Sequence, residues 1–391
     1  MDAETLGVYV HVPFCERVCP YCDFAVVGVR RLAAELEARY VRALLAELAW
    51  RREDFDGRAL ASLYLGGGTP SLLAPESVAR IVEAVRAAFP VRGWVETTVE
   101  VNPGTLERER LPGFRAAGVN RVSIGVQSFD DTTLKRLGRA HRAAEARRSL
   151  ATARKAGFEA ISLDLVFAAP GQDLAGFERD LEEALVFGPE HVSTYELSIE
   201  PGTPFATAAA RGQLRRAAEE EILAMVEAAE ARLEAAGFER YELSNFARPG
   251  FAAVHNRRYW ERRPVLGLGV GAFSTDPGRE GAPFGVRRAN VRDLNRYLEA
   301  ALAGSSAEQE PPEVLDAPTA RGEAVFLALR SAAGLDAGRF ASEFGRFPRG
   351  FWEEAIAGLV AGGLLEERLG GDLRLTRRGR QLADSVFEHF V

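Results

Sequence analysis

Short apolar segments and amphipathic stretches follow each other along the chain from residue 6 to about residue 300. The apolar segments predict seven strands, at residues 6–12, 61–65, 95–102, 120–126, 159–167, 190–197 and 239–245. Repeated strand–helix units favour parallel strands with the helices packed outside them. In barrels built this way, the loops at the carboxyl ends of the strands carry the chemistry.

Two of the amphipathic stretches show the helical period clearly. Between the first two strands every fourth residue is a large side chain, which gives one stripe of Leu32, Leu36, Tyr40, Leu44 and Leu48. A later helix carries the stripe Ile222, Met225, Val226, Ala229 and Leu233. Gly237 follows that helix at the position where a left-handed C-terminal cap belongs.

The pattern changes beyond residue 302. Residues 303–320 are polar and proline-bearing, so they predict a linker between residues 1–302 and residues 321–391. After it we expect a hairpin that turns at Gly370-Gly371 and three helices, near 320–331, 336–344 and 350–362. Thr376 is a candidate cap for a last helix, on which one face is shared by Leu382, Val386 and Phe390. These elements predict a small winged-helix-like α+β module.

Composition and charge limit the classes of function. Hydrophobic residues make up 47% of the 391 residues, which suffices for one large domain and a smaller module. The net charge is −7, and residues 321–391 hold ten arginines against ten acidic residues, so no nucleic-acid partner is expected. No stretch approaches the roughly 20 apolar residues of a membrane span, and the N-terminus lacks a signal-peptide pattern. We therefore expect a cytoplasmic protein without a transmembrane segment.

All three cysteines, Cys15, Cys19 and Cys22, stand in one window just after the first strand. Three thiols cannot pair off as disulfides, and burial alone requires no C-x3-C-x2-C spacing, so the window predicts a ligand site. Three thiolates can hold three irons of a four-iron cluster and leave the fourth iron open. A chance grouping and a structural zinc site with His11 as fourth ligand are the alternatives, although structural zinc usually draws on a second cysteine pair.

The run from Tyr9 to Phe24 resembles the cluster loop of the radical S-adenosylmethionine (SAM) superfamily. More narrowly, it is similar to the branch that contains oxygen-independent coproporphyrinogen III oxidase (HemN) and the HemW family of heme chaperones. Gly66-Gly67-Gly68-Thr69-Pro70 matches the GGGTP motif of that branch. The resemblance covers the whole chain and implies an α/β fold. Residues 1–302 would form a (β/α)6 partial barrel of the radical SAM type, and residues 321–391 a HemW/HemN-like module.

The resemblance also implies a SAM site beside a 4Fe-4S cluster on the three cysteines. Polar residues in or after the predicted strands match the family's SAM-contacting positions, namely Tyr9, Gly67, Gly68, Thr69, Glu100, Gln127, Arg139 and Asp164. In the family, an electron from the reduced cluster cleaves SAM to a 5′-deoxyadenosyl radical. We therefore expect a 4Fe-4S cluster, SAM and an electron donor that the sequence does not identify.

The hexamer His255-Asn256-Arg257-Arg258-Tyr259-Trp260 follows the last predicted strand. A lone histidine is more often structural than a ligand, but the H-N-x-x-Y-W form resembles the heme-binding signature of the HemW family. Imidazole can ligate heme iron, and aromatic rings can flank a flat macrocycle. The resemblance thus implies that heme is bound by His255, Asn256, Tyr259 and Trp260.

Two functions follow from the resemblance. The first is a heme chaperone that delivers heme to acceptor hemoproteins, and the second is oxidative decarboxylation of coproporphyrinogen III to protoporphyrinogen IX. Phe24 stands where the oxidase has a further cysteine, which favours the chaperone. A different radical SAM oxidation is the third alternative, and the sequence leaves open whether the protein turns over as an enzyme.

Overall fold

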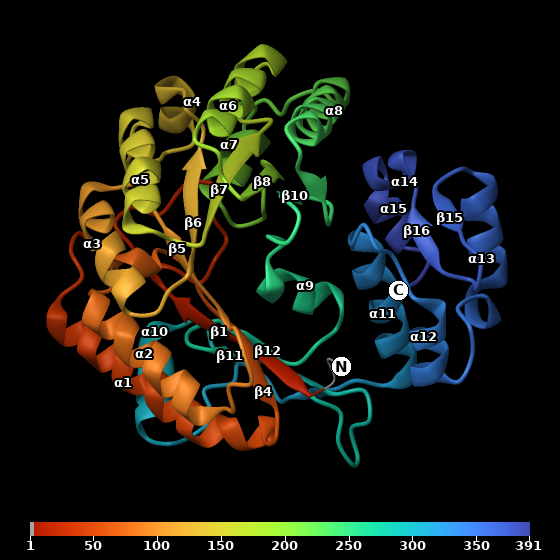
Figure 1. Cartoon of the computed structure of the whole chain (residues 1–391), viewed down its shortest axis with the longest axis horizontal. Helices are drawn as coiled ribbons and strands as arrows, with labels where there is room; N and C mark the ends of the chain where they lie inside the picture. The colour runs from red at the N-terminus through yellow and green to blue at the C-terminus, as the bar shows by residue number, and fades with distance from the viewer. Residues whose placement is uncertain (1–3) are drawn as a thin grey trace.

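The computed structural model describes residues 4–391, and Figure 1 shows the whole chain. Six parallel strands form the centre of a twelve-stranded sheet, and their order in space follows their order in the chain. They are β1 (Thr5–Val12), β4 (Ala59–Gly67), β5 (Glu96–Val101), β6 (Arg121–Gln127), β7 (Ala160–Phe167) and β8 (His191–Glu196). No pairing closes this sheet within residues 4–391, so the predicted (β/α)6 partial barrel is confirmed.

Helices cover the outer face of the partial barrel. Consecutive neighbours pack against each other from α1 through α2 and α3 to α5, and α10 closes onto α1 while α8 packs on α6. The long ones are α1 (Ala34–Arg51), α2 (Pro75–Ala88), α3 (Thr105–Ala116), α5 (Ala143–Ala156), α6 (Leu174–Val186), α8 (Glu219–Ala235) and α10 (Leu294–Leu302). The shorter ones are α4 (Asp131–Arg136), α7 (Pro204–Ala210) and α9 (Val254–Trp260). Gly237 has φ of +83° just after α8, which confirms the predicted left-handed cap.

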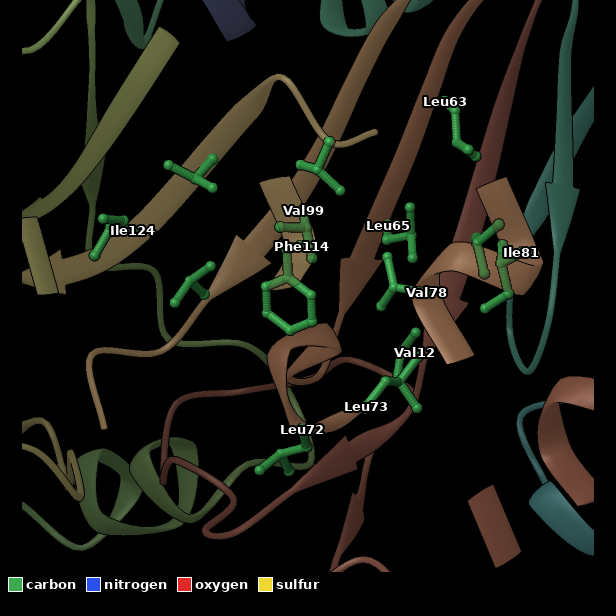
Figure 2. Packing of buried hydrophobic residues seen from close by; sticks show 14 of the residues in the cluster. Val12, Leu63, Leu65, Leu72, Leu73, Val78, Ile81, Val99, Phe114 and Ile124 are labelled. Carbon is green, nitrogen blue, oxygen red and sulfur yellow. The ribbon is translucent and has the colours of Figure 1, made fainter. Parts of the chain in front are cut away.

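Alternate residues of the central strands face two different environments. Apolar side chains such as Leu65, Val99 and Ile124 point outward into the apolar core, where Figure 2 shows Val78 of α2 beside Leu65 and Phe114 of α3 beside Val99. The residues between them face the inside of the partial barrel and are mostly polar, such as Glu100 of β5, Ser123 of β6 and Asp164 of β7. The apolar core therefore lies between sheet and helices, and the interior is left to polar side chains.

One edge of the sheet carries four strands that the sequence pattern did not predict. They are β11 (Val265–Leu268), β12 (Phe273–Asp276), β13 (Val286–Ala289) and β14 (Glu313–Val314). β11 runs parallel to β1, and the other three are antiparallel. β14 and the start of α11 (Ala317–Arg330) both fall within the predicted linker 303–320. The domain limits at 302 and 321 stay a prediction.

At the other edge, the prediction of one strand over 239–245 is wrong. The structure has two short antiparallel strands, β9 (Glu239–Arg240) and β10 (Asn245–Ala247), with a tight turn between them. The buried carboxylate of Glu242 holds the turn, because it accepts hydrogen bonds from the Ser244 backbone N–H at 2.8 Å and from the side-chain amide of Asn245. A polar residue inside the apparent strand is thus what breaks it.

The C-terminal module has its own apolar core and lies beside α9, in blue in Figure 1. It contains α11, α12 (Ala337–Phe344), α13 (Arg349–Ala361), the hairpin β15 (Leu365–Glu367) and β16 (Leu373–Leu375), α14 (Arg377–Gln381) and α15 (Ala383–Phe387). The Thr376 side chain accepts from the Gly379 N–H, as predicted for a cap. The prediction of a single last helix is wrong, because the chain bends at Leu382 (φ −118°) between α14 and α15. The Leu382 side chain is 45% exposed, whereas Val386 and Phe390 are buried.

Two short strands, β2 (Phe14–Cys15) and β3 (Val27–Gly28), and two 3-10 helices, η1 (Arg52–Phe55) and η2 (Pro70–Leu72), are also present. Among residues 4–391, none of the helices combines the length and the apolar character that crossing a lipid bilayer requires.

A buried ion pair fixes the unpredicted edge onto α1. The Arg51 guanidinium donates to Asp276 of β12 at 2.6 Å, and Arg288 of β13 donates to the same carboxylate at 2.6 Å. We expect Asp276→Ala to lower the free energy of unfolding by about 3–5 kcal/mol, because it leaves buried guanidinium charge uncompensated. Urea unfolding monitored by circular dichroism measures this loss.

Glu353→Ala is the matched control. It breaks an ion pair with Arg349, and the Glu353 side chain is 66% exposed. We expect less than about 1 kcal/mol from this exposed pair. Equal losses in the two variants would contradict the assignment of Asp276 as a structural anchor.

Candidate functional site

A cavity of about 620 Å³ occupies the inside of the partial barrel. Its wall is made by inward-facing residues of β4 to β8 and by the loop that follows β1. That loop folds back on itself, because the Val27 N–H donates to the Pro13 carbonyl at 2.7 Å and the Val29 N–H donates to the Cys15 carbonyl at 2.8 Å. The fold-back places all three cysteines on the cavity wall.

The three thiols have surroundings that suit thiolate ligands. Cys15 is buried, and its Sγ accepts from the Thr69 hydroxyl at 3.6 Å. The Cys19 Sγ accepts from the Arg139 guanidinium at 3.5 Å. Burial raises the pKa of the Cys15 thiol to about 11 and also raises the pKa of Cys22. Burial alone thus favours the protonated thiols, and a bound metal would be needed to hold them as thiolates. Three cysteine sulfurs on one cavity wall fit a 4Fe-4S cluster in which each thiolate binds its own iron.

The geometry gives no support to the zinc alternative. Both ring nitrogens of His11 are engaged, Nδ1 with the Tyr9 hydroxyl at 3.1 Å and Nε2 with the Ala25 carbonyl at 3.0 Å. Nowhere in residues 4–391 do three His, Cys, Asp or Glu side chains gather around one point as the ligands of a single ion would. His11 instead braces the cluster loop against β1.

Glycines at the end of β4 let the chain approach this loop closely. Gly67 has φ of +107°, and a Cβ there would meet the His11 ring at 2.5 Å. A Cβ on Gly68 would lie 2.9 Å from the backbone of Pro13. Only glycine therefore fits the two positions, and the Gly67 N–H is free to donate to Glu100 at 3.0 Å.

Glu100 is the acidic group in the middle of the cavity wall. Its other oxygen accepts from the Tyr64 hydroxyl at 2.8 Å. Burial raises the pKa of Glu100 to about 7, and the nearby Asp164 adds to the rise against the opposing hydrogen bonds from Tyr64 and Gly67. Asp164 itself accepts from the Ser123 hydroxyl at 3.1 Å, and its pKa is raised by burial. These carboxylates suit the amine of an amino-acid ligand.

Asn102 joins the two sides of the site and was missed in the sequence. Its side-chain amide donates to the Thr69 hydroxyl at 2.8 Å, and its carbonyl accepts from Arg139. The signal was present, because Asn102 follows Glu100 by two residues at the end of β5, and the two-residue period of the strand predicts that the two side chains lie on one side. Within residues 4–391 the buried Nε of Arg139 has no hydrogen-bond partner, which leaves a donor for a ligand carboxylate.

The predicted SAM residues are brought together with one exception. Gly67, Gly68, Thr69, Glu100, Gln127, Arg139 and Asp164 all line the cavity. Tyr9 lies behind the wall, where its ring stacks on Tyr64 at 6.1 Å between centroids. The cavity volume falls in the range of about 300–1,000 Å³ that is usual for small ligands. The carboxylates of Glu100 and Asp164 suit the amine of SAM, and the Arg139 Nε–H suits its carboxylate. The glycine backbone after β4 allows a ligand to approach closely.

The four predicted heme residues do not form one site in this structure. α9 sends His255 and Tyr259, four residues apart, to the same inner face. Asn256 lies on the cavity wall. Trp260 points to the C-terminal module, where the Arg330 guanidinium stacks over its ring at 4.7 Å.

His255 is in the position of a structural residue. It is 1% exposed, its Nδ1 lies 2.9 Å from the Ser62 hydroxyl, and its Nε2 lies 3.1 Å from the Tyr259 hydroxyl. Burial lowers the pKa of His255 to about 3, so the imidazole is neutral. Heme ligation by His255 stays a prediction, and in this conformation ligation through Nε2 requires the hydrogen bond to Tyr259 to break.

The pKa of Glu100 predicts how SAM affinity depends on pH. Below about pH 7 the carboxyl takes up a proton and loses its attraction for an ammonium group. We expect the dissociation constant of SAM to rise by up to about tenfold per pH unit below 7. Titration calorimetry on anaerobically reconstituted protein between pH 6 and 7.5 measures it. Glu100→Gln should bind weakly and flatten the profile, and an unchanged slope in this variant would exclude Glu100.

The buried imidazole predicts a stability effect. We expect His255→Ala to cost about 2–4 kcal/mol at pH 7.5, because it leaves a cavity and two unpaired hydroxyls. Because the lowered pKa keeps His255 neutral in the folded protein, the wild type loses stability below about pH 6.5, where histidine is protonated in the unfolded chain. The difference in unfolding free energy between wild type and His255→Ala should therefore be smaller at pH 5. Urea unfolding of the apoprotein measures both values. Ser62→Ala, which keeps the imidazole, should cost about 1 kcal/mol, and a stable His255→Ala would contradict the structural role.

Comparison with known proteins places this arrangement in a family. Residues 9–184 match the model of the Radical SAM superfamily, and residues 315–382 match the HemN C-terminal domain. Among solved structures, coproporphyrinogen III oxidase (HemN) from Escherichia coli, a radical SAM enzyme, superposes with a TM-score of 0.83 over 99% of this chain and 90% of that chain. At 24% sequence identity, this likeness shows a shared fold.

Curated relatives are more similar in sequence. Heme chaperone HemW of Bacillus subtilis (strain 168) is 34% identical over 386 residues, 98% of this chain and 99% of the relative. Heme chaperone HemW of Mycobacterium tuberculosis (strain H37Rv) is 36% identical over 99% of this chain and 95% of the relative. Heme chaperone HemW of Escherichia coli (strain K12) is 38% identical over 78% of this chain and 79% of the relative. The chain therefore belongs to the HemW family of radical SAM proteins.

Proposed function

We propose that this protein binds heme and delivers it to acceptor hemoproteins. The observation that carries the proposal is similarity to heme chaperones over almost the whole chain, through the partial barrel and the C-terminal module alike. The carrier would act in the cytoplasm, where thiols such as these three stay reduced.

Residues of the cavity wall would hold the two resident cofactors. Cys15, Cys19 and Cys22 would bind a 4Fe-4S cluster, and Glu100 and Arg139 would orient the amine and the carboxylate of SAM. A cluster held there would, once reduced, supply one electron to the sulfonium of SAM. Thr69 and Arg139, which donate to cysteine sulfur, would tune the charge on the thiolates. An electron donor of unidentified kind would be needed to reduce the cluster.

Oxidation of coproporphyrinogen III is the second candidate. The shared fold with the Escherichia coli oxidase favours it, since the partial barrel and the C-terminal module are both common to the two proteins. Against it stands Phe24, which occupies the position of the oxidase's further cysteine and lies 60% exposed at the cavity.

Two titrations separate the candidates. Anaerobically reconstituted protein is mixed with hemin, with and without SAM, and separately with coproporphyrinogen III, SAM and a reductant. For the carrier we expect a stable Soret band, transfer of the heme to an apo-hemoprotein, and no vinyl-bearing product. Formation of decarboxylated product over many turnovers would contradict the carrier function and support the oxidase function. Protein that carries zinc, or no inorganic sulfide, would contradict both.

A further inference from the structure

The inner end of the cavity, where the central strands begin, is lined by buried polar side chains that the SAM site does not use. Arg121 is the first residue of β6 and His191 is the first residue of β8, and both line the cavity. Thr98 of β5 and Asn256 of the α9 hexamer line it as well. The cysteine loop follows the carboxyl end of β1, so this group lies toward the opposite end of the parallel strands.

Arg121 is held at a different end of the cavity from Arg139. The Arg139 guanidinium bonds to the Cys19 sulfur and to the Gly125 carbonyl of β6. Arg121 begins the same strand, and about 13 Å of extended chain separates it from Gly125. The Arg121 guanidinium donates instead to the Phe251 carbonyl at 2.9 Å, in the segment just before α9. The two guanidiniums are thus positioned for different ligand groups.

Two donors at the inner end lack a hydrogen-bond partner within residues 4–391. They are Nη2 of Arg121 and the Thr98 hydroxyl, and the two side chains are 4% and 0% exposed. Thr98 pairs directly with Arg121 across β5 and β6, and partners in register point to the same face of a sheet. Buried donors in proteins are nearly always bonded. Two adjacent donors without partners therefore indicate a ligand group that accepts from both.

The carboxylates near Arg121 are engaged with other groups. Glu96 lies 3.7 Å from Nη1 of Arg121, and its oxygens accept from the backbone N–H groups of Val254 at 3.1 Å and His255 at 2.9 Å. Asp164 accepts from a serine hydroxyl of β6 at 3.1 Å. Glu96 thus ties Arg121 to the first turn of α9, where the hexamer begins, while Nη2 keeps its N–H groups for another acceptor.

The uncharged neighbours of Arg121 connect it to Asn256. His191 bonds through Nδ1 to the Ser162 hydroxyl at 2.6 Å and through Nε2 to the Tyr241 hydroxyl at 2.9 Å. Burial lowers the pKa of His191, and the nearby Arg121 lowers it further, so the imidazole is neutral. Burial raises the pKa of Tyr241, and Arg121 and the Asn256 side chain are among the groups that oppose the rise. One contiguous polar group therefore joins the buried guanidinium to the hexamer.

We propose that Arg121 and Thr98 bind a carboxylate of the tetrapyrrole that the α9 hexamer receives, and that Asn256 is the hexamer residue that faces this subsite. The proposal rests on the proposed function and leaves the ring with the hexamer. It adds the counter-charge that an acidic side chain of the ring requires. A carboxylate fits because its two oxygens accept from a guanidinium nitrogen and a neighbouring hydroxyl at once.

The test compares hemin with hemin dimethyl ester, whose carboxylates are blocked, on the full-length protein after anaerobic reconstitution. Wild type should bind hemin at least about tenfold more tightly than the ester. Thr98→Val should weaken hemin about threefold and leave the ester unchanged, because it removes one donor without changing the side-chain shape. The double variant Arg121→Gln/Glu96→Gln should weaken hemin about tenfold, again without effect on the ester. It removes both charges, so no buried carboxylate stays unpaired.

Thr97→Val is the matched control. Thr97 precedes Thr98 on β5 and so faces the other side of the strand, away from the cavity lining. Its buried hydroxyl also has no partner in the described part of the chain. The control should bind hemin and the ester as wild type does. Urea unfolding and the iron and sulfide content of each variant, measured first, show whether fold and cluster are intact, and Thr98→Val keeps the test valid if the double variant does not fold.

Equal losses of hemin and ester affinity in the variants would make Arg121 a structural support of α9 and would overturn the subsite. Equal affinity of wild type for hemin and the ester would overturn it as well. SAM is titrated separately by calorimetry, and weaker SAM binding with unchanged hemin affinity would give the carboxylate to SAM and contradict the proposal. Wild-type protein that does not bind hemin at all would instead overturn the proposed function.

Discussion

The two-residue alternation of the central strands is the constraint on which the rest of the structure depends. Outward positions such as Leu65, Val99 and Ile124 bury their side chains under the helices, and this layer supplies the apolar core. Because burial is satisfied on that side, inward positions are free to carry Glu100, Ser123 and Asp164. A fold with an apolar interior would have no room for a charged nucleoside. The polar interior is thus a direct result of where the core lies.

Much of the site was predictable because parallel strands bring their carboxyl ends to one edge. Gly67, Glu100 and Gln127 are far apart in sequence, yet each lies at the end of a strand or one residue before it, and their strands are consecutive neighbours. The cysteines follow β1, which is adjacent to β4. Local strand endings therefore sufficed to predict that these residues converge. Asn102 also lies at the carboxyl end of a strand. It was missed because it matches no recognised sequence motif.

Other features could not be predicted from local pattern. The strands β11 to β14 are two to four residues long, and the pairing of β11 with β1 joins segments more than two hundred residues apart. The break at Glu242 depends on a side chain that bonds to its own turn. The hexamer from His255 to Trp260 was treated as one unit, but the helical period of α9 separates its side chains into three directions. A contiguous motif on a helix is not a contiguous surface.

Arg139 has a consequence for how the protein is loaded. One guanidinium bonds to the Cys19 sulfur, to Asn102 and, at 3.3 Å, to the Gly125 carbonyl, and so touches both the metal-binding loop and the nucleoside pocket. Linkage between two binding equilibria is reciprocal, so whatever a filled pocket does to cluster affinity, a filled cluster site does equally to the pocket. Any coupling carried by Arg139 therefore has the same size whichever of the two sites is filled first.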